Sequence, residues 1–315
     1  MTPSARPPLL VVLGPTGAGK SALAHEVALL RGGEIVSADA FAVYRGFDAG
    51  TAKPSSERRR EIRYHLIDVA SPRETYSAGR WQQEARACVA EITRRGRLPI
   101  VCGGSGFYIQ ALLSGLPGGE AKDPRLREAL ARWSGGHRAA AYRLLEVNDP
   151  EAARRMSPGN LRYVTRALEI LLLTGLPPSA RLASSDSWAR RFRVVKVGVR
   201  PATADLYARI ARRVREMLDS GWEEEVRGLL AQGISREANA FGAIGYRELA
   251  DVILSDHAAS PGEMEKAIVT ATRQLAKRQT TWFRRERDVV WVTPEQALSR
   301  TLEILDAGNE TERRG

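Results

Sequence analysis

The sequence predicts a doubly wound α/β protein, in which a parallel sheet carries an inserted helical domain and a set of C-terminal helices. Four short segments are predicted to be strands: Leu9–Leu13, an apolar run typical of a buried parallel strand, Glu34–Ser37, Leu98–Cys102, and Arg193–Val199, which alternates and then turns at Arg200-Pro201. Helical patterns alternate with the first three of these segments. Between the third and fourth, from about residue 117 to 188, no clear strand is found.

The helices are predicted from apolar spacing and from the glycines that end them. Ser21–Leu30 has apolar residues at helical spacing and stops at Gly32-Gly33, and Trp81–Arg95 stops at Gly96. Asp205–Leu230 and Glu263–Arg287 continue the helical pattern after the fourth strand. We therefore expect residues 1–116 to form the first part of the α/β core, 117–188 to form the helical insertion, and 189–315 to complete the core with the C-terminal helices.

A glycine-rich turn follows the first predicted strand. Gly14-Pro15-Thr16-Gly17-Ala18-Gly19-Lys20-Ser21 fits the pattern G-x-x-x-x-G-K-[ST] at every fixed position, with a strand before it and a helix after it. In such a P-loop the backbone N–H groups and the helix N-terminus surround phosphate oxygens, the lysine adds a positive charge, and the Ser21 hydroxyl suits Mg²⁺. The sequence thus predicts a P-loop NTPase-like core that binds a diphosphate.

The position of the nearest carboxylate argues against simple nucleotide chemistry. A nucleotide kinase or ATPase usually has an apolar strand that ends in an Asp for Mg²⁺. Here Leu98–Cys102 is followed by Gly103-Gly104-Ser105-Gly106, and Asp39 instead ends the second strand. An Asp after a strand is often only a turn residue. The alternative is a general base or hydrogen-bond acceptor beside the phosphate site, with Thr16 sharing the role. Because these segments follow strand C-termini, they should face one crevice.

The charge of the chain favours an anionic partner. Lys and Arg number 48 against 37 Asp and Glu, a formal net charge of +11. Arg209, Arg212 and Arg213 lie on one predicted helix, where one guanidinium could grip a diphosphate. The last long helix combines Arg273, Lys277 and Arg278 with aromatic residues, which is compatible with binding of nucleic acid phosphates but also with an ordinary basic surface helix.

Other classes of protein are disfavoured. No apolar run approaches the roughly 18 residues of a membrane span, and the N-terminal region lacks a signal-peptide pattern. The two cysteines, Cys88 and Cys102, and the four scattered histidines show no disulfide or metal-ligand spacing. We expect a cytoplasmic monomer that is not associated with a membrane.

Seen together, the segments resemble the tRNA dimethylallyltransferase family, whose members isopentenylate an adenosine next to the anticodon. The resemblance runs from about Leu10 to Phe283. It rests on the P-loop with its Pro-Thr and on eight further segments in the same order: Ser37–Asp39, Val43–Gly46, Gly50–Pro54, His65–Asp68, Gly103–Tyr108, Arg166–Glu169, Ala243–Tyr246 and Ala271–Gln279.

The resemblance implies a reaction and a set of site residues. Dimethylallyl diphosphate would donate its prenyl group to N6 of the adenosine 3′ of the anticodon, with Mg²⁺ as cofactor and tRNA as partner. Asp39 and Thr16 would be the catalytic residues. The diphosphate would be bound by Gly14, Thr16, Gly17, Ala18, Gly19, Lys20, Ser21 and Arg213, and the metal by Ser21. The tRNA would contact Asp39, Ala40, Phe41, Ala42, Ser105, Arg127, Arg162, Arg166, Arg247, Arg273, Lys277 and Arg278.

The chain departs from the family pattern at some positions, and alternative functions remain. The departures are Ala40, Ala42, Tyr64, Gly159, Tyr163 and Gly242, several of which fall where the family meets tRNA. A nearby activity is prenylation of a free adenine nucleotide, which would need neither the basic insertion nor the basic C-terminal helix. A P-loop ATPase or kinase acting on RNA would need the missing carboxylate. A non-catalytic RNA-binding protein would not depend on Asp39.

Overall fold

The computed structural model describes residues 6–116, 122–183, 188–255 and 261–314. They divide into two compact units, one made of residues 1–109 and 191–315 and the other of residues 110–190. The first unit holds the sheet. Its elements are β1 (Pro8–Leu13), α1 (Lys20–Arg31), β2 (Gly33–Ser37), α2 (Ser56–Glu61), β3 (Tyr64–His65), α3 (Ala78–Arg94), β4 (Leu98–Gly103), β5 (Arg193–Val199), α10 (Thr203–Asp219), α11 (Trp222–Ala231), α12 (Tyr246–Leu254), α13 (Pro261–Phe283), β6 (Val289–Val292) and α14 (Ala297–Arg314).

The sheet is parallel throughout, with the strand order β3-β2-β4-β1-β5-β6. Its four inner strands confirm the four strands predicted from the sequence. Strands β3 and β6, which form the two edges, were not predicted, because β3 has two residues and β6 has four. The chain order doubles back at β1, which pairs with β4 on one side and β5 on the other.

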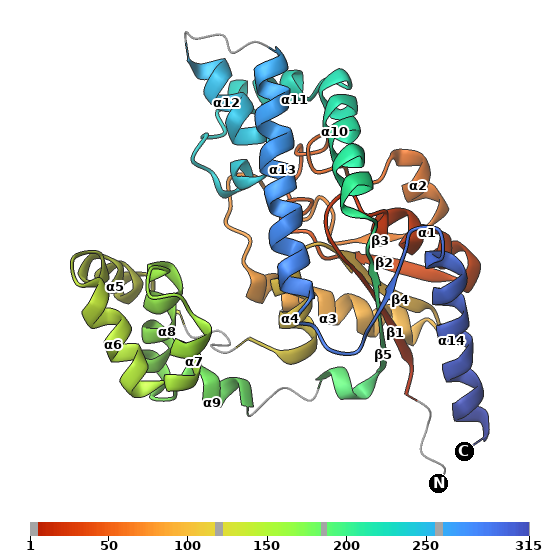
Figure 1. The fold of residues 1–315 in the computed structure, drawn as a ribbon, viewed down its shortest axis with the longest axis horizontal. Helices are drawn as coiled ribbons and strands as arrows, with labels where there is room; N and C mark the ends of the chain where they lie inside the picture. The colour runs from red at the N-terminus through yellow and green to blue at the C-terminus, as the bar shows by residue number, and fades with distance from the viewer. Residues whose placement is uncertain (1–5, 117–121, 184–187, 256–260, 315) are drawn as a thin grey trace. The chain divides into compact units, whose positions relative to one another are not determined.

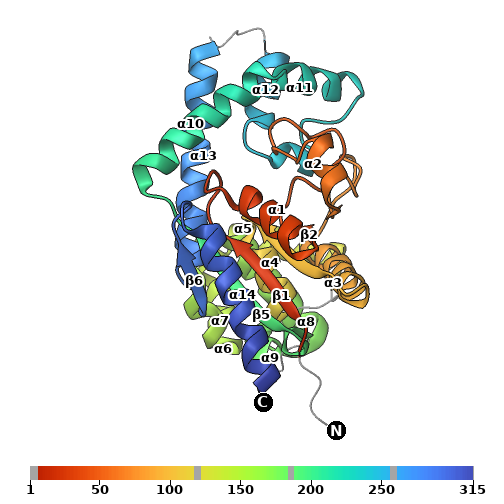
Figure 2. The same ribbon diagram turned by 90° about the vertical axis from the view of Figure 1, so that its right-hand side faces the viewer.

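Helices cover both faces of this sheet, which is why the central strand is buried. Helices α1 and α14 pack together over one face, as Figure 2 shows for the view in which they lie in front of β1. Helix α3 packs on β2 and β4, and the Trp81 indole at its start donates a hydrogen bond to the Ser37 carbonyl at 2.9 Å. A strand enclosed in this way reads as an uninterrupted apolar run, as Leu9–Leu13 does.

The helices after β5 form the other side of the site. The predicted helical stretch Asp205–Leu230 is two helices, α10 and α11. The break is at Gly221, whose φ of 90° is a left-handed conformation that favours glycine. Helix α13 packs along α10 and also contacts α12, and Figure 1 shows α13 as the long blue helix beside α10.

The second unit is helical, and α4 (Gly106–Ser114) leads into it. Alanine, valine and leucine side chains of α6 (Arg138–Asn148), α7 (Pro150–Arg155) and α8 (Leu161–Thr174) form its core, while α5 (Pro124–Gly136) and α9 (Pro178–Ala183) pack on α8. The Glu169 side chain is fully buried in this unit and accepts hydrogen bonds from Arg127, Arg166 and the Asp123 backbone.

Candidate active site

The P-loop lies between β1 and α1, and glycine is required in it. Gly14, Gly17 and Gly19 have φ values of 138°, 79° and 98°. A Cβ at Gly14 would come within 2.6 Å of the Val199 carbonyl oxygen, so the loop can lie against the end of β5 only with glycine there. The loop then leads directly into α1, and the N-terminal N–H groups of that helix are available to an anion.

A cavity of about 540 Å³ opens beside the P-loop and joins the segments that the sequence predicted to share a crevice. Thr16, Lys20 and Ser21 contribute from the P-loop, and Asp39 contributes from the end of β2. Further walls come from Gly103 and Gly104 at the end of β4, from α10, from the loop before α12, and from α13. The cavity thus lies at the carboxyl ends of the strands, where ligands bind doubly wound sheets.

Asp39 uses its two carboxylate oxygens differently. Oδ1 accepts hydrogen bonds from the backbone N–H groups of Phe41 at 2.8 Å and Ala42 at 3.1 Å. Oδ2 has no hydrogen-bond partner in the described part of the chain. Asp39 therefore holds a turn, as an Asp after a strand often does. It also presents a free carboxylate oxygen to the cavity. The two roles are compatible.

The loop after β4 supports this turn. A Cβ at Gly103 would come within 2.1 Å of the Ala38 carbonyl oxygen, so the chains after β2 and β4 approach as closely as they do only because residue 103 is glycine. The Ser105 hydroxyl accepts a hydrogen bond from the Ala40 N–H at 3.2 Å, and the Ser105 N–H donates to the Ala38 carbonyl. Ser105 thus holds the two residues on either side of Asp39, Ala38 and Ala40, through these two hydrogen bonds.

Two cations face Asp39 across the cavity. The Lys20 side chain is buried, and its ammonium donates a hydrogen bond to the Pro15 carbonyl at 2.6 Å. Burial lowers the pKa of Lys20 to about 8; the neighbouring Arg213 adds to this effect and Asp39 opposes it. Burial also lowers the pKa of the Arg213 guanidinium, with Asp39 acting in the opposite direction. Arg213 has no ion-pair partner within the described ranges, so both cations are available to a diphosphate.

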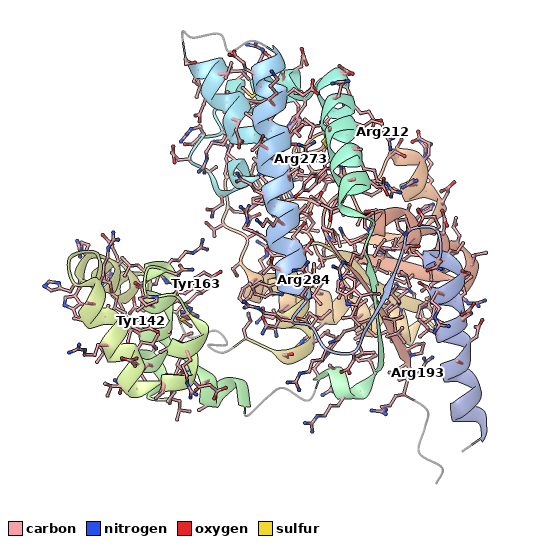
Figure 3. All side chains as sticks on the ribbon, viewed as in Figure 1. Tyr142, Tyr163, Arg193, Arg212, Arg273 and Arg284 are labelled. Atoms are coloured by element: carbon pink, nitrogen blue, oxygen red, sulfur yellow. The ribbon has the colours of Figure 1, made fainter. Side chains whose placement is uncertain are left out.

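A second cavity, of about 240 Å³, lies on the outer side of the P-loop. Gly17, Gly19 and Ser21 line it together with Arg209, Arg212 and Arg213. Figure 3 labels Arg212 on α10. Lys20, Ser21 and Arg213 line both cavities, so they stand where the two meet.

Gln279 is a site residue to which the sequence analysis gave no role. Its side-chain oxygen accepts a hydrogen bond from the Thr16 N–H at 2.7 Å, and its side-chain nitrogen donates to the Gly104 carbonyl at 3.0 Å. One amide on α13 therefore joins the P-loop to the loop after β4. The sequence pointed to Gln279 only through its place in the segment Ala271–Gln279, which is part of the family resemblance.

Trp222 explains two further family glycines. A Cβ at Gly50 or at Gly245 would come within 2.1 Å of the indole ring, which is buried between them and lines the cavity. Within the Gly50–Pro54 segment, the Thr51 hydroxyl donates to backbone carbonyls, and the Lys53 ammonium contacts the Tyr44 carbonyl, Asp48 and Asp68. Thr51 and Lys53 therefore hold this loop in its conformation.

The residues predicted to contact tRNA are found in different settings. Ala40, Phe41 and Ala42 follow Asp39, and Phe41, Ala42 and Arg278 line the cavity. Arg162, Arg247 and Lys277 are exposed. The Arg273 guanidinium lies 5.0 Å from the centre of the Tyr207 ring. Arg127 and Arg166 are paired with the buried Glu169 at 2.8 and 2.7 Å, so each has a structural role. Contact with tRNA stays a prediction for all of them.

The metal prediction rests on Ser21 alone. Within the ranges that the structure describes, no three His, Cys, Asp or Glu side chains gather as a metal site. Ser21 is exposed at the start of α1 and lines both cavities. A hydroxyl beside a diphosphate site fits Mg²⁺, which usually binds through one or two protein oxygens, water and substrate phosphates. None of the helices in the described ranges is long and apolar enough to cross a membrane.

Comparisons with known proteins identify relatives of this chain. The profile of a family described as IPP transferase matches residues 42–286. A tRNA dimethylallyltransferase of Geobacter metallireducens is 42% identical over 90% of this chain and 92% of its own, and one of Methylococcus capsulatus is 42% identical over 93% and 94%. The solved structure of the tRNA isopentenylpyrophosphate transferase of Bacillus halodurans covers 98% of both chains with a TM-score of 0.71 and 32% identity. A eukaryotic dimethylallyltransferase acting on tRNA covers 91% of this chain and 74% of its own with a TM-score of 0.78 and 25% identity. The chain belongs to the IPP transferase family.

Proposed function

We propose that this protein transfers the dimethylallyl group of dimethylallyl diphosphate to N6 of the adenosine 3′ of the anticodon in tRNA, releasing diphosphate. One observation carries the proposal. A single cavity holds the P-loop with two cations that have no ion-pair partner among the described residues, Lys20 and Arg213, and a carboxylate, Asp39, with one oxygen free. These are the groups that prenyl transfer to an amine requires, and the names of the relatives support the same assignment.

We expect dimethylallyl diphosphate to lie in one orientation in the cavity. Its diphosphate would lie in the P-loop, where Lys20, Arg213 and the N-terminal N–H groups of α1 neutralise charge. Apolar side chains line the cavity beyond them, and they would surround the five-carbon tail and exclude water. This apolar wall is formed by Ile210, Val214, Met217, Trp222, Ile244 and Leu275.

The reaction forms one bond and breaks one. The N6 nitrogen of adenine attacks C1 of the prenyl group, and the bond between C1 and the diphosphate oxygen breaks with its electron pair on the leaving group. Lys20 and Arg213 stabilise the negative charge that develops there. The nitrogen loses its extra proton to Oδ2 of Asp39, the oxygen that does not hold the turn. Mg²⁺, held by Ser21 and the diphosphate oxygens, would add positive charge at the leaving group.

The test is transfer of labelled substrate. The protein is incubated with Mg²⁺, labelled dimethylallyl diphosphate and an unmodified tRNA with adenosine 3′ of the anticodon, and the RNA is digested to nucleosides. We expect label in N6-isopentenyladenosine, and none when a tRNA with guanosine at that position is used. Label in free AMP without label in RNA would favour the nucleotide-prenylating alternative. ATP turnover without prenyl transfer would favour an ATPase or kinase.

A further inference from the structure

Two aromatic side chains near the cavity are exposed to solvent. Phe107 on α4 is 44% exposed and Trp282 on α13 is 38% exposed. The two come from segments that touch, because a Cβ at Gly106 would come within 2.3 Å of the Trp282 indole. The indole therefore lies against the backbone of the residue that precedes Phe107, and part of its surface remains open to solvent.

Trp282 continues the side of α13 that lines the cavity. Leu275 and Gln279 both line it, and Trp282 follows them at the i+7 and i+3 positions of the same helix. Residues at these spacings share one helical face. Gln279 also donates to the Gly104 carbonyl, which is part of the loop leading to Gly106. The indole thus lies about one helical turn beyond the edge of the cavity.

The surroundings of the indole are basic. Lys277, Arg278, Arg284 and Arg285 are exposed on or just after this end of α13, and none has an ion-pair partner in the part of the chain that the structure describes. Figure 3 labels Arg284 at this end of the helix. The indole N–H also has no hydrogen-bond acceptor among the described residues. Unpaired cations beside an exposed ring are typical of surfaces that bind single-stranded nucleic acid, whereas an apolar peptide would gain nothing from the charges.

We propose that Trp282, together with Phe107, stacks against an unpaired base of the RNA substrate that neighbours the reacting adenosine. This inference rests on the proposed function. An adenine that reaches Asp39 must leave the stack of its loop, and the base beside it then loses a stacking partner. An aromatic ring about one helical turn beyond the cavity replaces that partner, and Arg278 and Arg284 contact the adjoining phosphates.

The experiment tests whether the Trp282 indole interacts with one particular base of the RNA. RNA stem-loops with an abasic site at each loop position in turn are tested for binding, in the absence of dimethylallyl diphosphate, to the full-length wild-type protein and to Trp282→Ala. We expect Trp282→Ala to weaken binding of the intact stem-loop about tenfold, the usual effect of losing one stacked base. At a loop position next to the adenosine 3′ of the anticodon, and at no other, the abasic site should weaken wild-type binding by a similar factor and leave Trp282→Ala binding unchanged.

Two variants serve as controls. Trp282→Phe should keep most of the affinity, because a phenyl ring also stacks. Leu30→Ala removes an exposed apolar side chain at the far end of α1, 56% exposed, and should leave RNA binding unchanged. Independent losses from Trp282→Ala and from every abasic site would overturn the proposal. So would a loss of thermal stability in Trp282→Ala that accounts for its weaker RNA binding. Because no transfer is measured, a wild-type protein that shows the coupling but transfers no prenyl group would contradict the proposed function and not this one.

Discussion

The side-chain oxygen of Gln279 accepts a hydrogen bond from the Thr16 N–H at 2.7 Å, across 263 positions of the chain. The same amide donates to the Gly104 carbonyl, so α13 fixes the P-loop relative to the loop after β4. This arrangement makes the diphosphate site depend on a helix that contributes no phosphate ligand to the P-loop motif. The position of Thr16 at the wall of the cavity follows from this contact.

Replacing Gln279 should therefore impair use of the diphosphate substrate. Gln279→Leu removes both hydrogen bonds at similar size, and we expect kcat/KM for dimethylallyl diphosphate to fall about 10- to 100-fold, because the P-loop loses its fixed geometry. Steady-state kinetics with tRNA held at saturation would measure this. Gln274→Leu changes an exposed glutamine on the same helix and should have no effect. An unchanged kcat/KM in Gln279→Leu would show that the P-loop holds its shape unaided.

The two roles of Asp39, holding the turn and the proposed acceptance of a proton, can be tested separately. In Asp39→Asn the amide oxygen can still accept the hydrogen bonds from Phe41 and Ala42, but the group no longer takes a proton. We expect kcat to fall about 10²- to 10⁴-fold, the range for loss of a general base, with little change in the affinity for tRNA. Single-turnover transfer and a separate tRNA binding assay would give the two values. Asp39→Ala should in addition lower stability, because it removes the turn. Equal losses of rate and of tRNA affinity in Asp39→Asn would make Asp39 a binding residue.

The lowered pKa of Lys20 predicts a pH dependence of substrate capture. Lys20 is charged below a pH of about 8 in the free protein and loses its proton above it. We expect kcat/KM for dimethylallyl diphosphate, which reports the free enzyme, to fall by up to about tenfold per pH unit above 8. Binding of tRNA alone, measured over the same range, is the control and should not change in parallel.

The same titration affects the stability of the free protein in the opposite direction. The folded pKa of Lys20 lies below its unfolded value of 10.5, so the unfolded chain binds more protons between a pH of about 8 and 10.5. The contribution of this group to stability therefore rises with pH in that window. Urea unfolding of wild type and of Lys20→Met would isolate it, since the variant should lack this rise.

The pairing of Arg127 and Arg166 with Glu169 predicts a structural effect. Burial would raise the pKa of Glu169, but hydrogen bonds from the two arginines lower it below its ordinary value. Removing both arginines leaves a fully buried carboxylate unpaired, and we expect a loss of about 3 kcal/mol in the stability of the helical unit. The contribution of Glu169 in the wild type should be present above its ordinary pKa and be lost as the pH falls below it.

Urea unfolding of Arg127→Ala/Arg166→Ala, followed by circular dichroism, would measure this loss. Arg162→Ala is a matched control, because Arg162 is exposed on the same helix as Arg166 and has no partner among the described residues. If the double variant keeps its stability and loses only tRNA affinity, the two arginines are RNA contacts and their pairing with Glu169 is incidental.

The parts of the site that could be predicted from the sequence are those carried by short contiguous patterns. The P-loop motif between an apolar run and a helical pattern identified Lys20 and Ser21, and Asp39 followed from its place at the end of a strand. Gln279 could not be found in this way, because a glutamine on a long helix gives no local sign of contacting a loop far away in sequence. Likewise, no sequence pattern indicated that Glu169 is fully buried, although Arg166 and Glu169 have the i, i+3 spacing of a helical ion pair.

The edge strands β3 and β6 could not be predicted from the sequence for a related reason. Tyr64–His65 and Val289–Val292 are too short for an alternation or an apolar run to be distinguished from a loop, and they become strands only because β2 and β5 are there to pair with. The break at Gly221 was missed because helical spacing continues on both sides of it.

The position of β1 at the centre of the sheet has a consequence for how the protein is made. One edge of β1 pairs with β4, but the other must wait for β5, whose first residue is Arg193. About 180 residues separate the end of β1 from Arg193, so at ribosomal rates of about 5–20 residues per second this edge stays open for roughly 10–40 s. An unpaired apolar strand edge is a target for aggregation. Nascent chains that end before Arg193 should therefore need a chaperone, whereas the release of β5 from the ribosome pairs the open edge of β1.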